Sequence, residues 1–203
     1  HTLHHILTAQ TEPQVSGING VEWDAVELPS QFLENFAWEH EIVKSISAHV
    51  ETGEQLPDEL FDKMIAAKNY EAGAFCVRQV EFALFDMLLH SAFDPKTDSV
   101  QALLDSVRRE VAVVFPPAWN RFPQSFSHIF AGGYGAGYYS YKWAEVLSAD
   151  CFSAFEEEGV LNPDTGRRYL KEILERGSSR DAIDNFVAFR VRKPELDPLL
   201  RLS

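Results

Sequence analysis

Positive charge is scarce in this 203-residue sequence. It has 18 lysines and arginines against 31 aspartates and glutamates, which gives a formal net charge of −13 at pH 7. A nucleic-acid partner requires clustered cationic side chains that displace counterions from phosphates. The densest basic cluster, Arg190, Arg192 and Lys193, is short and typical of a solvated terminal segment. The charge balance therefore predicts no nucleic-acid partner.

Cysteine and long apolar runs are scarce as well. Cys76 and Cys151 stand singly in apolar surroundings, without the closely spaced partner of a metal knuckle or a redox pair. We expect both to be buried, reduced thiols, as in cytoplasmic proteins. No apolar run approaches the roughly 20 residues that a membrane helix needs, and no signal-like segment opens the sequence. These observations predict a cytoplasmic protein without a membrane partner.

The alternating pattern of strands is nearly absent. Apolar residues recur at spacings of three and four, which predicts an all-α chain, a multi-helix bundle with at most a short hairpin near 122–137. The apolar content of 45% and the lack of repeats or linkers indicate a single unit over residues 1–203. The apolar segment 69–91 is expected at the centre of the core. The other expected helices are 1–9, 21–47 with a kink or a junction at Pro29, one from 56, one ending near 111, 138–158, and two short ones opened at 162 and 178.

Three histidines, His1, His4 and His5, stand at the start of the sequence. His1 and His5 share one helix face by their i,i+4 spacing, so the tract is compatible with a metal site. Histidines on a polar helix face are more often simply solvated, and the residues alone favour that interpretation.

Three acids, Glu22, Asp24 and Glu27, lie near the start of a predicted helix. Acids at this position complement the helix dipole, which is the ordinary explanation for them. Glu27 differs because its i,i+4 spacing from Trp23 turns it toward the apolar side. A buried carboxylate requires a cation, a metal or a proton as its partner. Glu27 is therefore the acid most strongly indicated as functional.

A stretch from 126 to 141 combines glycines with a histidine and tyrosines. The glycines permit a mobile or left-handed loop, while phenols and an imidazole supply directed hydrogen-bond donors. Such a loop can close over an extended ligand and stabilise an oxyanion. A glycine-rich turn with stacked aromatics explains the composition equally well. The candidate side chains are His128, Tyr134, Tyr138, Tyr139 and Tyr141.

Taken together, these segments resemble the zinc-dependent oligopeptidases, the family of thimet oligopeptidase and dipeptidyl carboxypeptidase. The likeness runs over essentially the whole sequence and is carried by His1-Thr2-Leu3-His4, by the run Val-Glu-Leu-Pro-Ser-Gln at 26–31, by 128–143, by 156–159 and by 176–178. In that family an H-E-x-x-H helix supplies two zinc-binding histidines and a catalytic glutamate, and a second helix supplies a glutamate ligand. The resemblance implies that His1 and Glu27 bind Zn²⁺.

The resemblance also implies roles for the loop. His128, Tyr134, Tyr138 and Tyr141 would contact a peptide substrate, and Tyr141 with His128 would be catalytic by hydrogen-bonding the oxyanion. Glu22 or Asp24 could orient a zinc-bound histidine from behind, although electrostatics at the helix start is the favoured explanation for both.

The family's first histidine and its catalytic glutamate would precede His1. We therefore expect residues 1–203 to be the C-terminal part of the catalytic region of a zinc metallopeptidase for short peptides, inactive by itself, with the N-terminal part of the same enzyme as a partner. Two alternatives stay open: a non-catalytic module that binds peptides, and a helical fragment whose apolar face packs on the missing part.

Overall fold

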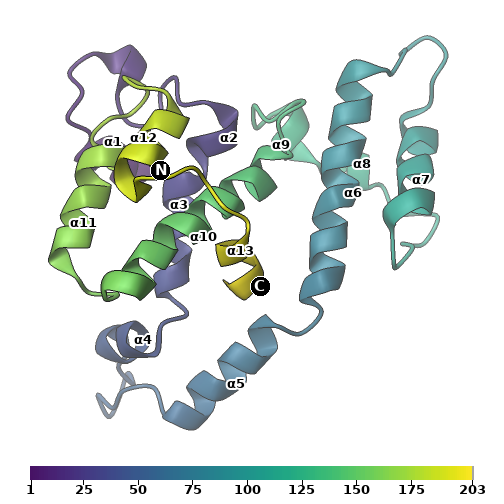
Figure 1. The fold of residues 1–203 in the computed structure, drawn as a ribbon. Helices are drawn as coiled ribbons and strands as arrows, with labels where there is room; N and C mark the ends of the chain where they lie inside the picture. Colours follow the sequence, from purple (N-terminus) through teal and green to yellow (C-terminus); the bar gives the residue numbers. More distant parts are fainter. Residues whose placement is uncertain (203) are drawn as a thin grey trace. The chain divides into compact units, whose positions relative to one another are not determined.

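The structure, a computed structural model, describes residues 1–202 as helices joined by turns and loops (Figure 1). No strand occurs in this range, so the all-α prediction is confirmed. The short hairpin that the sequence allowed near 122–137 does not occur in this range. That segment forms helices α8 (Phe122–Ser125) and α9 (Ser127–Phe130), because Pro123 fits the first turn of α8 and tight turns follow α9.

The chain divides into two compact units. Unit 1 comprises His1–Tyr70 and Trp143–Ser203, and unit 2 comprises Glu71–Lys142. Unit 2 holds α6 (Ala72–Ser91), α7 (Val100–Val111), α8 and α9. Unit 1 holds α1 (Thr2–Leu7), a 3-10 turn (Pro13–Val15), α2 (Trp23–Val26), α3 (Leu28–Phe36), α4 (His40–Ile46), α5 (Asp58–Lys68), most of α10 (Ser140–Glu158), α11 (Pro163–Tyr169), a π-helical turn (Leu170–Leu174), α12 (Ala182–Arg190) and α13 (Asp197–Leu202).

The predicted segment 21–47 is divided into α2, α3 and α4. Pro29 lies in the first turn of α3, where a missing N–H costs no helical hydrogen bond, so a junction rather than a kink is observed. Glu27 is the residue between α2 and α3, with φ −89° and ψ −3°. A new helix therefore begins at Leu28, directly after the candidate glutamate, and Pro29 lies in its first turn.

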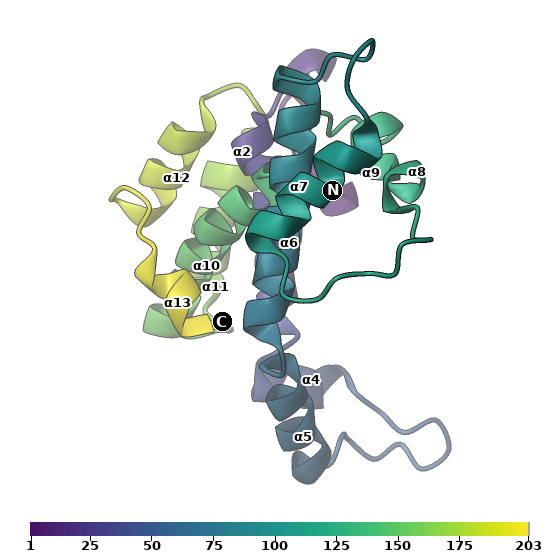
Figure 2. The same cartoon turned by 90° about the vertical axis from the view of Figure 1, so that its right-hand side faces the viewer.

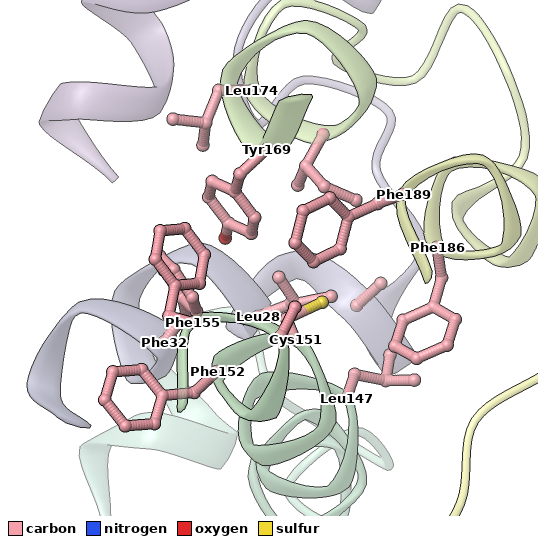
Figure 3. Packing of buried hydrophobic residues seen from close by; sticks show 13 residues of the cluster. Leu28, Phe32, Leu147, Cys151, Phe152, Phe155, Tyr169, Leu174, Phe186 and Phe189 are labelled. Atoms are coloured by element: carbon pink, nitrogen blue, oxygen red, sulfur yellow. The ribbon is translucent and has the colours of Figure 1, made fainter. Parts of the chain in front are cut away.

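The core of unit 1 gathers aromatic side chains from α3, α10, α11 and α12 (Figure 3). Phe32 stacks on Tyr169 with ring centroids 4.0 Å apart, and Phe152 and Phe186 are fully buried. Each buried Phe contributes on the order of 2–3 kcal/mol to folding. This core anchors α3, and hence the α2–α3 junction, against the long helix α10.

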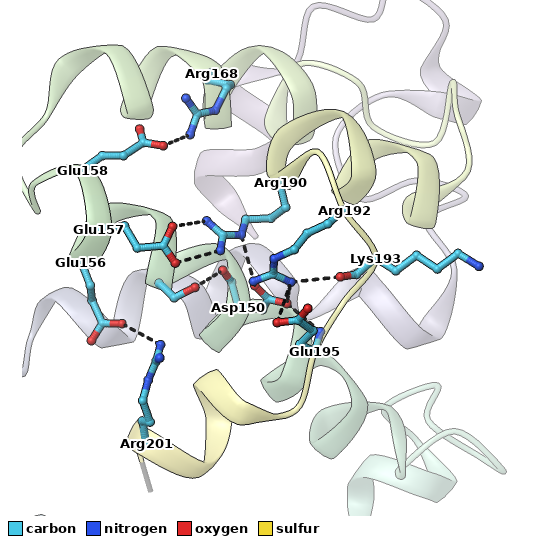
Figure 4. Close-up of polar contacts among 11 residues, drawn as sticks. Asp150, Glu156, Glu157, Glu158, Arg168, Arg190, Arg192, Lys193, Glu195 and Arg201 are labelled. Atoms are coloured by element: carbon cyan, nitrogen blue, oxygen red, sulfur yellow. Dashed lines mark hydrogen bonds and ion pairs between the residues drawn. The ribbon is translucent and has the colours of Figure 1, made fainter.

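A buried carboxylate ties the segment after α12 to α10 (Figure 4). Asp150 is fully buried and accepts hydrogen bonds from Arg190 Nε at 3.1 Å, Arg192 Nη1 at 2.7 Å and the Glu195 backbone N–H at 2.7 Å. Arg190 also pairs with Glu157. Arg190 and Arg192 of the basic cluster are therefore engaged in ion pairs, and the Arg190 side chain is buried rather than solvated as expected.

In unit 2, α6 packs along α7: the two helices lie side by side in Figure 1, and α7 lies in front of α6 in Figure 2. Phe85 and Leu104 are fully buried between them, and Glu81 forms a buried ion pair with Arg108. The expectation that α6 is the centre of the core is wrong, because Phe85 is its one fully buried apolar side chain and Phe75 is 63% exposed.

The two cysteines differ in their surroundings. Cys151 is buried in unit 1, as expected, and burial raises the pKa of its thiol well above the ordinary value. Cys76 is exposed, so the prediction of a buried thiol is wrong there. Like Phe75, it lies on a part of α6 that no other described helix buries. Within residues 1–202, no helix has both the length and the apolar character to cross a bilayer.

Candidate functional site

The first group of candidate residues joins the start of α1 to the α2–α3 junction in unit 1. His1 Nε2 lies 3.2 Å from Glu27 Oε1. The Glu27 residue is 6% exposed, which agrees with the prediction that it turns inward, whereas Trp23 is 45% exposed. A desolvated carboxylate beside an imidazole is thus present where the resemblance expects two zinc ligands.

Ser30 holds the other oxygen of the same carboxylate. Its hydroxyl donates to Glu27 Oε2 at 2.7 Å and lies 3.0 Å from the Glu27 carbonyl oxygen. Because Ser30 stands one turn after Glu27 on α3, the serine orients the carboxylate so that Oε1 faces His1. Sequence reasoning did not single out Ser30, although a hydroxyl three residues after a buried acid on a helix can be expected to donate a hydrogen bond to it.

The His1–Glu27 pair has the separation expected of two ligands on one zinc ion. Zinc binds imidazole nitrogen and carboxylate oxygen at about 2.0–2.2 Å in tetrahedral sites, which places neighbouring donors roughly 3.3 Å apart. The observed 3.2 Å is a hydrogen-bond distance and is also close to this spacing. Within the described part of the chain, however, no three His, Cys, Asp or Glu side chains form a group that could hold a metal. The residues present therefore fit part of a zinc site.

The other two histidines of the first segment do not join this pair as a metal tract. Gly17 has φ +63°, and a Cβ there would lie 2.2 Å from His5 Nδ1, so His5 packs against the glycine backbone. His4 is 3% exposed, and neither ring nitrogen has a hydrogen-bond partner within residues 1–202. Burial, and secondarily the nearby His5 and α-amino charges, lowers the pKa of His4 to about 4. His4 is therefore a buried neutral imidazole, not the solvated one expected.

Glu22 serves another helix. Its Oε1 accepts a hydrogen bond of 3.0 Å from the backbone N–H of Ala182, the first residue of α12. The side chain of Asp181, at the N-cap of α12, makes no capping hydrogen bond of its own. Glu22 thus accepts a hydrogen bond at the start of α12, whereas the favoured explanation placed its role at the start of its own helix, α2. Asp24 lies in the first turn of α2, as that explanation requires.

The second group lies in unit 2, where the loop after α9 brings the predicted histidine and tyrosines together. Tyr134 and Tyr141 are stacked with centroids 4.9 Å apart. The His128 ring lies 6.1 Å from Tyr141, 5.8 Å from Tyr138 and 6.3 Å from Tyr134, each in an edge-to-face arrangement. His128 is exposed and the three tyrosines are half-buried, so the cluster presents donors at a surface.

Glycines are required in this loop by its backbone geometry. The N–H of Tyr134 donates to the carbonyl of His128 at 2.9 Å, closing a tight turn. A Cβ on Gly132 would lie 2.9 Å from that same carbonyl oxygen, and Gly133 adopts φ +84°. The glycines therefore allow the chain to turn so that Tyr134 lies against His128. Both interpretations of the sequence apply here, because the segment is a tight turn and also gathers hydrogen-bond donors.

Helix α6 supplies two partners of the loop that sequence reasoning missed. Tyr138 Oη donates to Gln79 Oε1 at 2.9 Å, and Asp86 accepts hydrogen bonds from loop backbone. Burial, and secondarily Tyr141, raises the pKa of Tyr138, so its phenol stays protonated near neutral pH. Asp86 stands inside the apolar run Phe85–Leu89, and the criterion that identified Glu27, an acid on an apolar face, would have found it.

The fold and these groups define a class: an all-helical chain in which an exposed histidine contacts a buried glutamate, and which also carries a loop of one histidine and three tyrosines. The comparison with protein families agrees with this class. Residues 1–202 match Peptidase family M3. The chain belongs to this family.

The most similar relatives include two bacterial enzymes. The chain is 57% identical to oligopeptidase A of Escherichia coli and 56% identical to oligopeptidase A of Salmonella typhimurium, in each case over 201 residues. It is 33% identical to saccharolysin of Saccharomyces cerevisiae over 202 residues. These alignments cover 98–99% of the chain but only 28–30% of the relatives. The chain thus spans less than a third of the length of the proteins it resembles.

Proposed function

We propose that this chain forms part of a zinc metallopeptidase that hydrolyses short peptides. The observation that carries the proposal is the 3.2 Å separation of His1 Nε2 and Glu27 Oε1 in a chain that belongs to Peptidase family M3. Both donor types bind zinc, and their spacing matches neighbouring positions in a tetrahedral site.

In the proposed enzyme, His1 and Glu27 hold the zinc ion. A zinc ion in such a site polarises the scissile carbonyl and makes a water molecule nucleophilic near neutral pH. Ser30 keeps the Glu27 carboxylate in its orientation by donating to Oε2, so that Oε1 stays available on the side of His1. The chain by itself holds an incomplete ligand set, and we propose that residues 1–203 alone are inactive.

The loop residues act on the peptide. Tyr141 and His128 donate hydrogen bonds to the oxyanion that develops on the scissile carbonyl, and Tyr134 and Tyr138 contact the peptide backbone. The edge-to-face packing of the imidazole against three phenols restrains all four rings before substrate arrives. Such preorganisation lowers the cost of ordering donors in the transition state.

Short peptides and the N-terminal part of the same enzyme are the proposed partners, in the cytoplasm and without nucleic acid or membrane. The apolar side of α1 supports an intramolecular partner. Its residues Leu3 and Ile6 are 49% and 68% exposed, whereas His4 is the buried residue of that helix. An apolar face of this kind is typical of a surface that packs against further polypeptide.

A non-catalytic peptide-binding module is the second candidate. The lack of any three-donor metal group within residues 1–202 favours it for the isolated chain. In that case the histidine–tyrosine loop would bind a peptide without cleaving it. The two functions differ in their response to a chelator: binding by a module is unchanged when zinc is removed, and hydrolysis is abolished.

A chimera tests the proposed peptidase function. Residues 1–203 replace the matching segment of oligopeptidase A from Escherichia coli, which supplies the rest of an enzyme of the same family. We expect the chimera to hydrolyse a quenched fluorescent peptide, to lose this activity to a chelator, and to lose at least 100-fold of it with Glu27→Gln. The matched control is Glu59→Gln, an exposed glutamate of α5. A Glu27→Gln chimera that is as active as the chimera with Glu27 contradicts the proposal.

A further inference from the structure

Asp86 is a fully buried carboxylate that neither the family pattern nor the proposed reaction uses. It lies on α6, and both of its oxygens are directed to the loop that follows α9. Oδ1 accepts the backbone N–H of Ala136 at 2.9 Å, and Oδ2 accepts that of Tyr138 at 2.9 Å. One side chain thus fixes two backbone positions that lie 50 and 52 residues further along the chain.

His90 completes the arrangement from the next turn of α6. Its Nδ1 lies 2.8 Å from Asp86 Oδ1 and 2.9 Å from the Asp86 carbonyl oxygen. The ring also borders the loop, because a Cβ on Gly135 would lie 3.2 Å from His90 Nε2. A larger residue at position 135 would therefore push the loop away from the two α6 side chains.

The loop conformation needs an external restraint. Ala136 adopts φ +57°, a left-handed conformation that residues with a Cβ rarely occupy without compensation. Hydrogen bonds from backbone N–H groups to a buried carboxylate are among the stronger ones in proteins, because the acceptor is charged and shielded from water. Asp86 accepts two of them, one from Ala136 itself and one from Tyr138, on either side of Gly137.

We propose that Asp86, braced by His90, is a positioning residue that holds the tyrosine loop in its peptide-binding conformation. The carboxylate fixes the backbone of Tyr138 directly, and through the turn at 134–137 it restrains Tyr134. This inference rests on the proposed role of the loop in binding peptides, but the restraint itself is a property of the described residues and can be measured without substrate.

The matched pair Asp86→Asn and Glu81→Gln tests the restraint. Both substitutions change a buried carboxylate of α6 to an amide, but the carboxylate of Glu81 pairs with Arg78 and Arg108, whereas that of Asp86 accepts loop N–H groups. Hydrogen exchange of individual amides is followed by NMR. We expect Asp86→Asn to accelerate exchange at Ala136 and Tyr138 at least tenfold relative to the amides of α7, and Glu81→Gln to change the two loop amides less than twofold.

Unchanged exchange at Ala136 and Tyr138 in folded Asp86→Asn protein overturns the proposal. If Asp86→Asn does not fold, His90→Gln is the second variant. It removes the ring that braces the carboxylate while keeping both acceptors, and we expect about threefold faster exchange at the same two amides; no change there also overturns the proposal.

Peptide kinetics in the chimera separate this inference from the proposed function. We expect Asp86→Asn to raise KM for the peptide about tenfold and Glu81→Gln to leave it within twofold. A chimera that cleaves no peptide would contradict the proposed function. The hydrogen-exchange experiment would still show whether Asp86 restrains the loop backbone. An active chimera whose KM is unaffected by Asp86→Asn would contradict the positioning role.

Discussion

His1 Nε2 and Glu27 Oε1 lie 3.2 Å apart although 26 residues separate them in the sequence. The loop between α1 and α2 returns the chain so that the start of α1 meets the α2–α3 junction. Helix α3 begins at Leu28, immediately after Glu27, and Ser30 in its first turn donates a hydrogen bond to the second carboxylate oxygen. The pair is therefore formed by a contact distant in sequence, and it presents two donors with the spacing of zinc ligands.

This geometry predicts weak zinc binding by the isolated chain. Two protein donors, supplemented by water or a terminal amine, make an incomplete site, so calorimetry at neutral pH should give a dissociation constant in the micromolar range or weaker. Glu27→Gln should weaken binding at least tenfold, and Glu59→Gln should not change it. Sub-micromolar affinity, or equal affinity of the Glu27→Gln variant, would contradict the ligand assignment.

Ser30 should support zinc affinity without touching the metal. Ser30→Ala removes the donor to Glu27 Oε2 and lets the carboxylate rotate, which in comparable sites lowers metal affinity about 10–100-fold. Chelator competition in the chimera measures this, with Ser30→Thr expected to recover most of the loss. The control is Ser45→Ala, whose hydroxyl donates only to a backbone carbonyl in α4. An Ser30→Ala chimera with parental affinity would show that the serine has no role in orientation.

Tyr141 should act mainly on the chemical step. Removing one donor to a developing oxyanion typically lowers kcat about 10²–10³-fold, so Tyr141→Phe in the chimera should lower kcat by this amount while KM changes little. Phenylalanine preserves the stacking of position 141 on Tyr134, which isolates the hydroxyl. Tyr70→Phe, at an exposed site, is the control. A kcat within threefold of the parent would remove Tyr141 from the mechanism.

His4 should make unit 1 sensitive to acid. Its pKa is lowered to about 4 in the folded chain against about 6.5 in an unfolded one, so the unfolded state binds more protons between these values. The contribution of the neutral ring to stability is complete above about pH 6.5 and is lost as the pH falls toward 4. The loss is on the order of 3 kcal/mol.

His4→Leu provides the measurement. Urea unfolding at pH 7.5 and 4.5 should show a smaller acid loss for His4→Leu than for the wild type. Stability at pH 7.5 should be equal or higher, because two unpaired buried nitrogens are removed. His49→Gln, at an exposed histidine, should leave both values unchanged. If His4→Leu loses as much unfolding free energy between pH 7.5 and 4.5 as the wild type, groups other than His4 cause the acid sensitivity.

Helical periodicity predicted most elements of the fold from the sequence. The helix ending at Val111, the stop of α10 at Gly159 and the cap at Asn162 are all observed, because each depends on residues adjacent in the chain. The exposure of α6 was not predictable in this way. Its apolar run resembles a central core helix, but burial depends on how many other helices reach it, and periodicity within one helix does not contain that information.

The candidate residues show the same limit. Glu27 was identified because a carboxylate on an apolar face needs a partner, and the structure places it beside His1. Asp86 satisfies the same criterion but was overlooked, since its partners are backbone N–H groups 50 and 52 residues away. Glu22 was predicted to complement the dipole of the helix that it precedes, whereas its carboxylate accepts a hydrogen bond from Ala182 of α12. In all three cases the partner of the carboxylate lies far away in the sequence, and helical periodicity does not predict such contacts.

The most direct test of the central claim is anomalous diffraction at the zinc absorption edge from crystals of the zinc-loaded chimera. We predict a zinc peak at about 2.0–2.2 Å from both His1 Nε2 and Glu27 Oε1. A peak bound to neither atom, or no ordered peak between them in a chimera that cleaves peptides, would contradict the claim that this pair holds the catalytic metal.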